Sequence, residues 1–271
     1  MTDQIKIAKA TKTQNQPLRE GEVWELFNMN SKITESDLYA SSQVVAATMR
    51  QMPLSFKAES RPMMPLPSPD GLDVPQRSLK ESMLERCTPQ NLLATDLSQS
   101  ELATILYSCA GQNRTAQEAQ ADRPFRVVPS GGALYPLEVY VHCQNVVGIP
   151  KGIYHYDPTD HCLRLHVEGD QTEKLSRIVV QPNLPADTSI QLIFTMIPAR
   201  LVLKYGNRGY RFALLEAGHA SQNAIVASRA MGYEAVPVGG FRDEALELML
   251  GIDGVNHVAS YLTFIGKDQD A

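Results

Sequence analysis

Two adjacent residues, Lys204 and Tyr205, are the part of this sequence best suited to remove a proton from a substrate. An isolated tyrosine has a pKa of about 10, so it acts as a base at neutral pH only where a cation stabilises its phenolate. Lys204 is adjacent, and Arg208 lies three residues further on. The pair is therefore a candidate general base, although the same dipeptide is also common in ordinary surface strands.

Two glycine pairs are candidates for contact with a flat ligand. One ends the stretch Pro129, Ser130, Gly131 and Gly132, and the other is Gly239 and Gly240. The first pair precedes a run of β-branched and aromatic residues over 137–143, which predicts a strand. Because glycine has no side chain, a planar ligand can approach the main chain at such a place.

Alternating or continuous apolar runs predict the strands that position these residues. Besides 137–143, strands are expected over 153–156, 162–167, 190–197 and 258–265, and 235–241 is expected to hold a short strand that leads into a glycine turn. The run 190–197 is unbroken and apolar, so it is expected at the centre of a sheet with both faces buried.

Helices are expected over 78–86, 96–111, 172–180 and from about 212 to Gly232. Ser78 is a plausible N-cap, and Ser98 followed by Glu101 is typical of a helix start. Alanines recur every three or four residues along the last helix, which predicts a thin face that another helix can approach closely. The polar stretch 112–122 is expected to be a loop.

The N-terminal quarter differs in composition from the rest. Residues 1 to about 20 are polar and without period, a short helix is expected within 22–49, and 52–75 is rich in proline. We interpret 1–76 as a leader, a short helix and a proline-rich arm, and 77–271 as the main domain.

The composition argues against several classes of function. The chain has 271 residues, 43% of them hydrophobic, and a net charge of −5 with scattered basic residues, which argues against nucleic-acid binding. No apolar run is long enough for a membrane span, and residues 1–16 lack the apolar core of a secretion signal. Four cysteines without a C-x-x-C pair fit a reducing cytoplasm. His142, His155, His161 and His166 have no metal-ligand spacing, so no metal is expected.

Four stretches of this sequence resemble one family of enzymes. They are PSGGALYPLEVY from Pro129, GIYHYDP from Gly152, KYGNRGYRFALLEAGHASQN from Lys204 and AVPVGGF from Ala235. They resemble the flavin-dependent dehydrogenases of the SagB/ThcOx type, a branch of the nitroreductase-like flavoproteins. The resemblance implies an α+β nitroreductase-like fold, with a central, mostly antiparallel sheet flanked by helices, and a homodimer with FMN at the subunit seam.

The same resemblance assigns roles to individual residues. It implies that Arg86 grips the flavin phosphate and that Thr88 and Gln90 approach the pyrimidine edge of the ring. Gln90 departs from the usual cationic residue, because a neutral amide cannot offset charge on the reduced ring. The backbone N–H of Gly239 would face flavin N5, and Lys267 would add a phosphate contact. Gly240 and the stretch 129–132 would complete the cofactor site, and Lys204 with Tyr205 would be catalytic.

The function implied is the oxidation of a thiazoline or oxazoline in a peptide to the thiazole or oxazole. Tyr205, assisted by Lys204, would take a proton from the ring while FMN accepts hydride, with oxygen as the final oxidant. The substrate peptide is either free or bound to a carrier, and a biosynthetic partner protein is possible. An NAD(P)H-dependent nitro- or quinone reductase, and a mainly scaffolding subunit of a peptide-modifying complex, remain open as alternatives.

Overall fold

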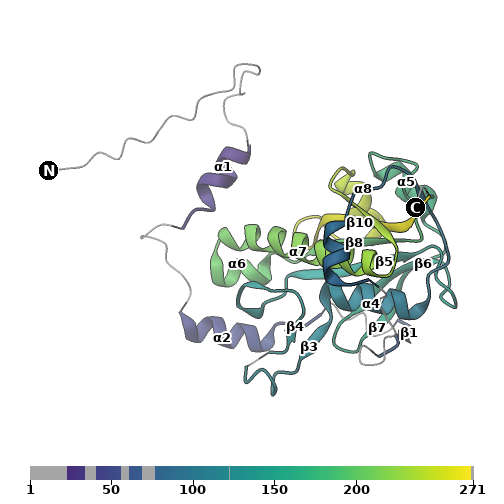
Figure 1. Ribbon diagram of the computed structural model, residues 1–271. Coiled ribbons are helices and arrows are strands. Elements are labelled where there is room, and N and C mark those ends of the chain that lie inside the picture. Colours follow the sequence, from purple (N-terminus) through teal and green to yellow (C-terminus); the bar gives the residue numbers. More distant parts are fainter. Residues whose placement is uncertain (1–22, 34–40, 56–60, 69–76, 122, 270–271) are drawn as a thin grey trace.

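The computed structural model describes residues 23–33, 41–55, 61–68, 77–121 and 123–269 (Figure 1). The expected leader over 1–20 lies outside these residues, as do parts of the proline-rich arm. The described part of 22–49 holds two helices, α1 (Val23–Asn30) and α2 (Ser42–Gln51), where one was expected. Within the described part of the arm, the short strand β1 (Met63–Pro65) is the regular element.

The core of the molecule is an antiparallel sheet in the order β1-β7-β6-β5-β8-β10-β2, with β9 also paired to β10. All of these pairs are antiparallel, which confirms the expected fold class. The strands are β2 (Leu92–Leu93), β5 (Leu137–Cys143), β6 (Gly152–Asp157), β7 (Cys162–Glu168), β8 (Ile190–Met196), β9 (Glu234–Val238) and β10 (Val258–Asp268). Every residue of β8 is buried, as its apolar run predicted.

Helices cover both faces of this sheet (Figure 1). On one face, α4 (Gln99–Ala110) and α7 (Arg208–Ala230) pack on alternate residues of β8, among them Leu192 and Phe194. On the other face, α5 (Thr172–Ile178) and α8 (Asp243–Leu250) pack with Ile193. Because strand side chains alternate in direction, one central strand supports two separate hydrophobic clusters. Within the described ranges, no helix has the length and apolar character needed to span a membrane.

Two helix starts were predicted correctly from their capping residues. Ser78 caps α3 (Leu79–Leu84) and Ser98 caps α4, each in a capping box with a glutamate three residues later. The apolar side of α3, however, faces solvent in the single chain. Leu79, Met83 and Leu84 are 70%, 55% and 75% exposed.

Two expectations were wrong in detail, and two helices were not expected. The stretch 112–122 begins with a strand, β3 (Gln112–Arg114), which pairs with β4 (Phe125–Arg126) across the turn. Lys204 and Tyr205 end a helix, α6 (Ala199–Tyr205), and α7 begins four residues earlier than expected. The helix α8 was not expected. The pairing of β3 with β4 and the contact between α6 and α7 outweigh the weak local signals of these stretches.

Candidate functional site

The first glycine pair lies directly against the proposed catalytic pair. A Cβ atom added to Gly132 would lie 2.8 Å from Lys204 Nζ and 2.9 Å from Tyr205 Oη. A Cβ added to Gly131 would lie 3.3 Å from the Tyr205 ring and 3.3 Å from Phe212. The main chain of this loop is therefore bare at the point where the amine and the phenol meet, and no residue larger than glycine fits at 132 without displacing them.

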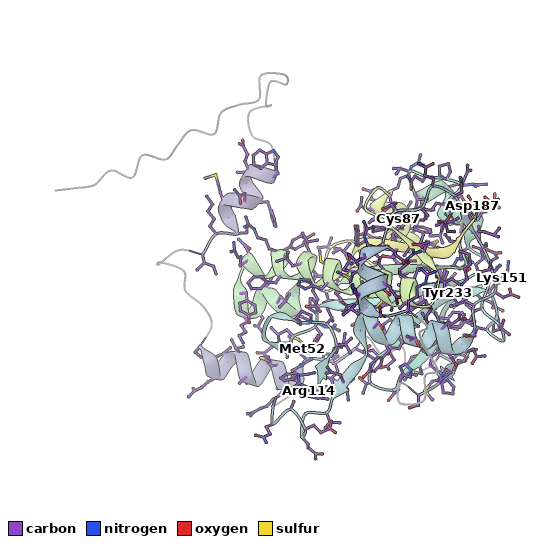
Figure 2. All side chains as sticks on the ribbon, viewed as in Figure 1. Met52, Cys87, Arg114, Lys151, Asp187 and Tyr233 are labelled. Atoms are coloured by element: carbon purple, nitrogen blue, oxygen red, sulfur yellow. The ribbon has the colours of Figure 1, made fainter. Side chains whose placement is uncertain are left out.

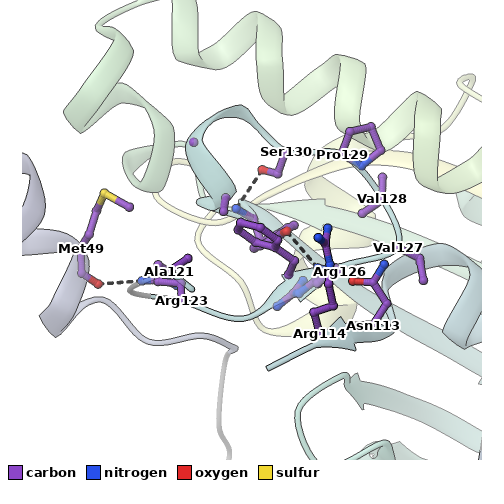
Figure 3. Close-up of a pocket in the computed structure, with 14 residues that line it drawn as sticks. Met49, Asn113, Arg114, Ala121, Arg123, Arg126, Val127, Val128, Pro129 and Ser130 are labelled. Carbon is purple, nitrogen blue, oxygen red and sulfur yellow. Dashed lines mark hydrogen bonds between the residues drawn. The ribbon is translucent and has the colours of Figure 1, made fainter. Parts of the chain in front are cut away.

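Side-chain hydrogen bonds hold this loop in place (Figure 3). Ser130 Oγ accepts from the backbone N–H of Tyr135 at 2.9 Å, and the Tyr135 hydroxyl accepts from the N–H of Arg126 at 2.9 Å. Gly132, Ala133 and Tyr135 all have positive φ. Left-handed backbone at two non-glycine residues is strained, and such strain persists only where surrounding contacts enforce it.

A network of buried charged residues connects β5 and α6 to the glycine loop. Glu138 on β5 pairs with Arg200 on α6 at 2.6 Å and with His155 at 2.8 Å, and it accepts from Ser55 at 3.3 Å. Burial alone would raise the pKa of Glu138, but Arg200 and His155 hold that pKa below its usual range. Arg200 also donates to the carbonyl of Tyr135 at 2.9 Å, so the network joins α6 to the glycine loop.

A second buried carboxyl, Glu216, projects from α7 and is 2% exposed. Burial raises the pKa of Glu216 to about 7, with Ser130, Arg126 and Arg200 opposing the rise. Its neighbour Ser130 belongs to the glycine loop. Sequence reasoning did not single out Glu216, and its place inside an alanine-rich helix face was the only available signal.

The residues proposed to hold the flavin phosphate gather elsewhere, at the C-terminal end of α7. There the N–H of Arg77, just before α3, donates to the carbonyl of Ala230, and Arg229 pairs with Glu85 of α3. Arg86, Thr88 and Gln90 follow α3 directly and are exposed.

Lys267 lies at the same end of α7. Its Nζ donates to the carbonyl of Gly232 at 2.9 Å and lies 3.7 Å from the centre of the Tyr233 ring. Lys267 is also the strand partner of Leu93 in β2. The segment 86–90 is therefore held near the end of α7 on both sides, by Glu85 before it and by Leu93 after it.

The second glycine pair follows β9. A Cβ added to Gly240 would lie 2.7 Å from Val180, whereas one added to Gly239 would only touch Tyr261 at 3.6 Å. Gly240 is thus required by packing, while Gly239 leaves its backbone open.

Within one chain, the residues proposed to bind the flavin phosphate lie far from the proposed catalytic pair and its glycine loop. Gly131 contacts Phe212 near the start of α7, and Lys267 contacts Gly232 just after its end. At 1.5 Å per residue these points are about 30 Å apart. Figure 2 places Cys87, next to Arg86, and Tyr233 on one side of the molecule, and Met52 and Arg114 on the other.

The expectation of no metal site at His142, His155, His161 and His166 stays a prediction. Among the described residues, the group with ligand atoms close enough to hold an ion is Asp157, Asp160 and Cys162. Both carboxylates already pair with Arg164.

Comparison with known proteins identifies relatives for most of the chain. A model of the nitroreductase family matches residues 83–267. A protein of Methanocaldococcus jannaschii named as a nitroreductase is 30% identical over 180 residues, which cover 66% of this chain and 87% of that protein. The microcin B17-processing protein McbC of Escherichia coli is 26% identical (67% and 68% covered), and the trifolitoxin-processing protein TfxB of Rhizobium leguminosarum is 27% identical (59% and 45%).

Solved structures share the fold at lower identity. A protein of Anabaena variabilis named as a nitroreductase has a TM-score of 0.70 and 20% identity, over 96% of this chain and 50% of that chain. A chain of the E. coli microcin synthetase McbBCD complex with truncated pro-MccB17 bound has a TM-score of 0.59 and 20% identity (90% and 91% covered). An Exiguobacterium sibiricum protein solved in complex with FMN has a TM-score of 0.50 and 13% identity (73% and 91%).

Proposed function

Because the chain belongs to the nitroreductase family, we propose that it is an FMN-dependent oxidoreductase that converts a thiazoline or oxazoline in a peptide to the aromatic azole. The observation that carries this proposal is the meeting of Lys204 Nζ and Tyr205 Oη at the bare main chain of Gly132. The similarity to two peptide-processing proteins, McbC and TfxB, supports a peptide as the substrate.

The residues present fit a bound flavin. Gly131 and Gly132 form a surface that any side chain at 132 would fill, which suits a planar ring. Arg86 is exposed, and its guanidinium can bind a phosphate through two hydrogen bonds, while the exposed backbone of Gly239 can approach the ring. When bound, FMN supplies a two-electron acceptor for hydride.

The proposed task of the protein's own residues is to take the proton that leaves with that hydride. The Lys204 ammonium stabilises Tyr205 as the phenolate, which takes the proton beside the azoline nitrogen and becomes the neutral phenol. Phe212 packs on the Tyr205 ring edge-on, at 5.1 Å between centroids, and so fixes its direction. Loss of one proton and one hydride leaves the ring aromatic.

A second copy of the chain would complete the site. The residues proposed for the phosphate and those proposed for catalysis lie at opposite ends of α7, so two chains that pack α7 in opposite directions would bring one group of each together. The exposed leucines of α3, and Leu214 and Leu215 of α7, are the apolar surface such a homodimer would bury. A partner protein that makes the azoline is also part of the proposal, by analogy with the McbBCD complex.

An NAD(P)H-dependent nitro- or quinone reductase is the second candidate, favoured by the relative from M. jannaschii. Anaerobic mixing of the protein with a thiazoline-bearing peptide, followed at the flavin absorbance, separates the two. A parallel run with NADPH tests the reductase. Bleaching by NADPH alone would replace our proposal with the reductase, and a protein that takes up no FMN would exclude both.

The variant Tyr205→Phe tests the proposed base. We expect bleaching by thiazoline to slow by about 10²- to 10⁴-fold with unchanged flavin content. Tyr210→Phe is the matched control, because Tyr210 is half-buried on the neighbouring helix and packs on Phe27 of α1. Equal rates in Tyr205→Phe and wild type would remove Tyr205 from the mechanism.

A further inference from the structure

A cavity of about 630 Å³ opens beside the glycine loop, on the side away from α7 (Figure 3). Ser130 and Gly132 form part of its wall, and three arginines, Arg114, Arg123 and Arg126, form another part. None of the described residues that line it is acidic. Sequence reasoning missed these arginines, although all three fall within the stretch 114–126, just before the glycine loop.

The positive charge of two of these arginines is balanced by no lining carboxylate. Arg123 and Arg126 are 4% and 9% exposed. Arg123 donates to the carbonyls of Met49 and Met52, and Arg126 to the carbonyl of Leu54. Backbone carbonyls satisfy hydrogen bonds but carry no net charge, so these partners do not neutralise the guanidinium charges in a poorly solvated place.

The nearby carboxyls offset only part of this charge. Glu138 attracts Arg126 but is shared with Arg200 and His155, and the pKa of Glu216 is raised to about 7, so part of Glu216 is neutral at physiological pH. The cavity therefore keeps a net positive potential, which attracts an anion.

Among the described lining residues, Arg114 is the arginine whose donors an anion can reach. Arg123 Nε also has no hydrogen-bond partner among the described residues, but it is buried. Arg114 is exposed, and its guanidinium lies 4.8 Å from the centre of the Phe125 ring, an arrangement that holds the planar group without using its N–H donors. A guanidinium fork matches the two oxygens of a carboxylate.

We propose that this arginine-lined cavity binds a carboxylate of the substrate peptide, within about two residues of the azoline ring. Gly132 separates the cavity from Lys204 and Tyr205, so an extended peptide can lie across the loop with its ring on one side and its carboxylate on the other. A carboxylate needs only the two-pronged fork of one guanidinium, which Arg114 offers, whereas several donors of Arg123 and Arg126 already bind backbone carbonyls. This inference rests on the proposed function, since it assigns the substrate class to the same site.

Two thiazoline peptides that differ only by glutamate or glutamine beside the ring test it. We expect wild-type protein to oxidise the glutamate peptide with a KM about tenfold lower, and Arg114→Gln to abolish this preference while leaving kcat and the glutamine peptide unchanged. Arg177→Gln is the matched control, because Arg177 is an exposed arginine on α5. An equal KM for both peptides with wild-type protein would overturn the inference.

Two further measurements separate the possible sources of failure. Binding of the corresponding azole products, followed by fluorescence anisotropy, reports the carboxylate preference without turnover, so it remains informative if the chain does not oxidise thiazolines. The flavin content of Arg114→Gln is measured after dialysis. Loss of FMN from this variant would show that the cavity holds the cofactor phosphate and would overturn the peptide assignment.

Discussion

At the scale of single residues, Glu216 is a titrating group buried beneath the proposed catalytic loop. Its folded-state pKa of about 7 lies above the ordinary value of 4.5. Between these two values the folded chain keeps a proton that the unfolded chain has lost. Stability therefore falls as pH rises through this window, and the loss is complete above the folded-state pKa.

We predict that Glu216→Gln removes this pH dependence. At pH 8 the free energy of unfolding should rise by about 3 kcal/mol, because a shift of about 2.5 pKa units corresponds to this energy and an amide needs no ionisation. Urea denaturation at about pH 5 and about pH 8 measures the change. Glu173→Gln on α5 is the control, because the Glu173 side chain is 81% exposed. Parallel pH profiles for Glu216→Gln and wild type would contradict the prediction.

The sequence indicated some of these residues and not others, for a physical reason. Lys204, Tyr205 and the glycines stand in recognisable stretches, and the structure places Gly132 against the pair. Arg123 and Arg126 carry no such signal, because their partners are backbone carbonyls about 70 positions away. Any residue type supplies a carbonyl, so no pattern marks the partner of a buried arginine.

At the scale of elements, the loop 129–132 depends on the absence of a side chain at Gly132. We predict that Gly132→Ala loses thiazoline-driven bleaching, because its Cβ would displace Lys204 Nζ and Tyr205 Oη. Gly251→Ala is a close control, since both glycines have φ of 64° but nothing lies within 4 Å of a Cβ at 251.

Both variants should lose about 1 kcal/mol of stability from the left-handed backbone, and only Gly132→Ala should lose activity. Thermal unfolding and stopped-flow absorbance measure the two effects. An active Gly132→Ala protein would show that the loop and the catalytic pair do not act together.

Elements with strong local patterns were predictable, and those made by packing were not. The bounds of β5 agree with the prediction because its seven buried residues are centred on the β-branched and aromatic stretch Val139, Tyr140 and Val141. The start of α7 was missed because Gly206 and Gly209 are typical of a turn. Gly209 lies instead in the first helical turn, where its Cβ would be 2.7 Å from the Leu201 backbone. Contact between α6 and α7 therefore selects the glycine.

At the scale of the whole molecule, packing between segments that are far apart in the sequence decides which site residues lie close together within one chain. Phe27 of α1 packs edge-on against Tyr210 of α7, with 5.8 Å between ring centroids, although 183 positions separate them. No local pattern in the sequence predicts such a contact. The same holds for the separation of the two site groups along α7, which follows only from where α3 and α6 pack on that helix.

This separation predicts that two defective chains can restore one working site. Arg86→Ala should lose FMN and Tyr205→Phe should lose catalysis, so each homodimer is inactive. In a mixed dimer one site carries both substitutions and the other carries neither. Co-refolding equal amounts should therefore recover about a quarter of wild-type activity, since about half of the dimers are mixed and each has one intact site.

Bleaching by the thiazoline peptide measures the recovery. Mixing Tyr205→Phe with Lys204→Ala is the control, because both substitutions fall in the catalytic pair and no site would be intact. Activity that stays at background in the first mixture, with mixed dimers verified by mass, would place the whole site within a single chain.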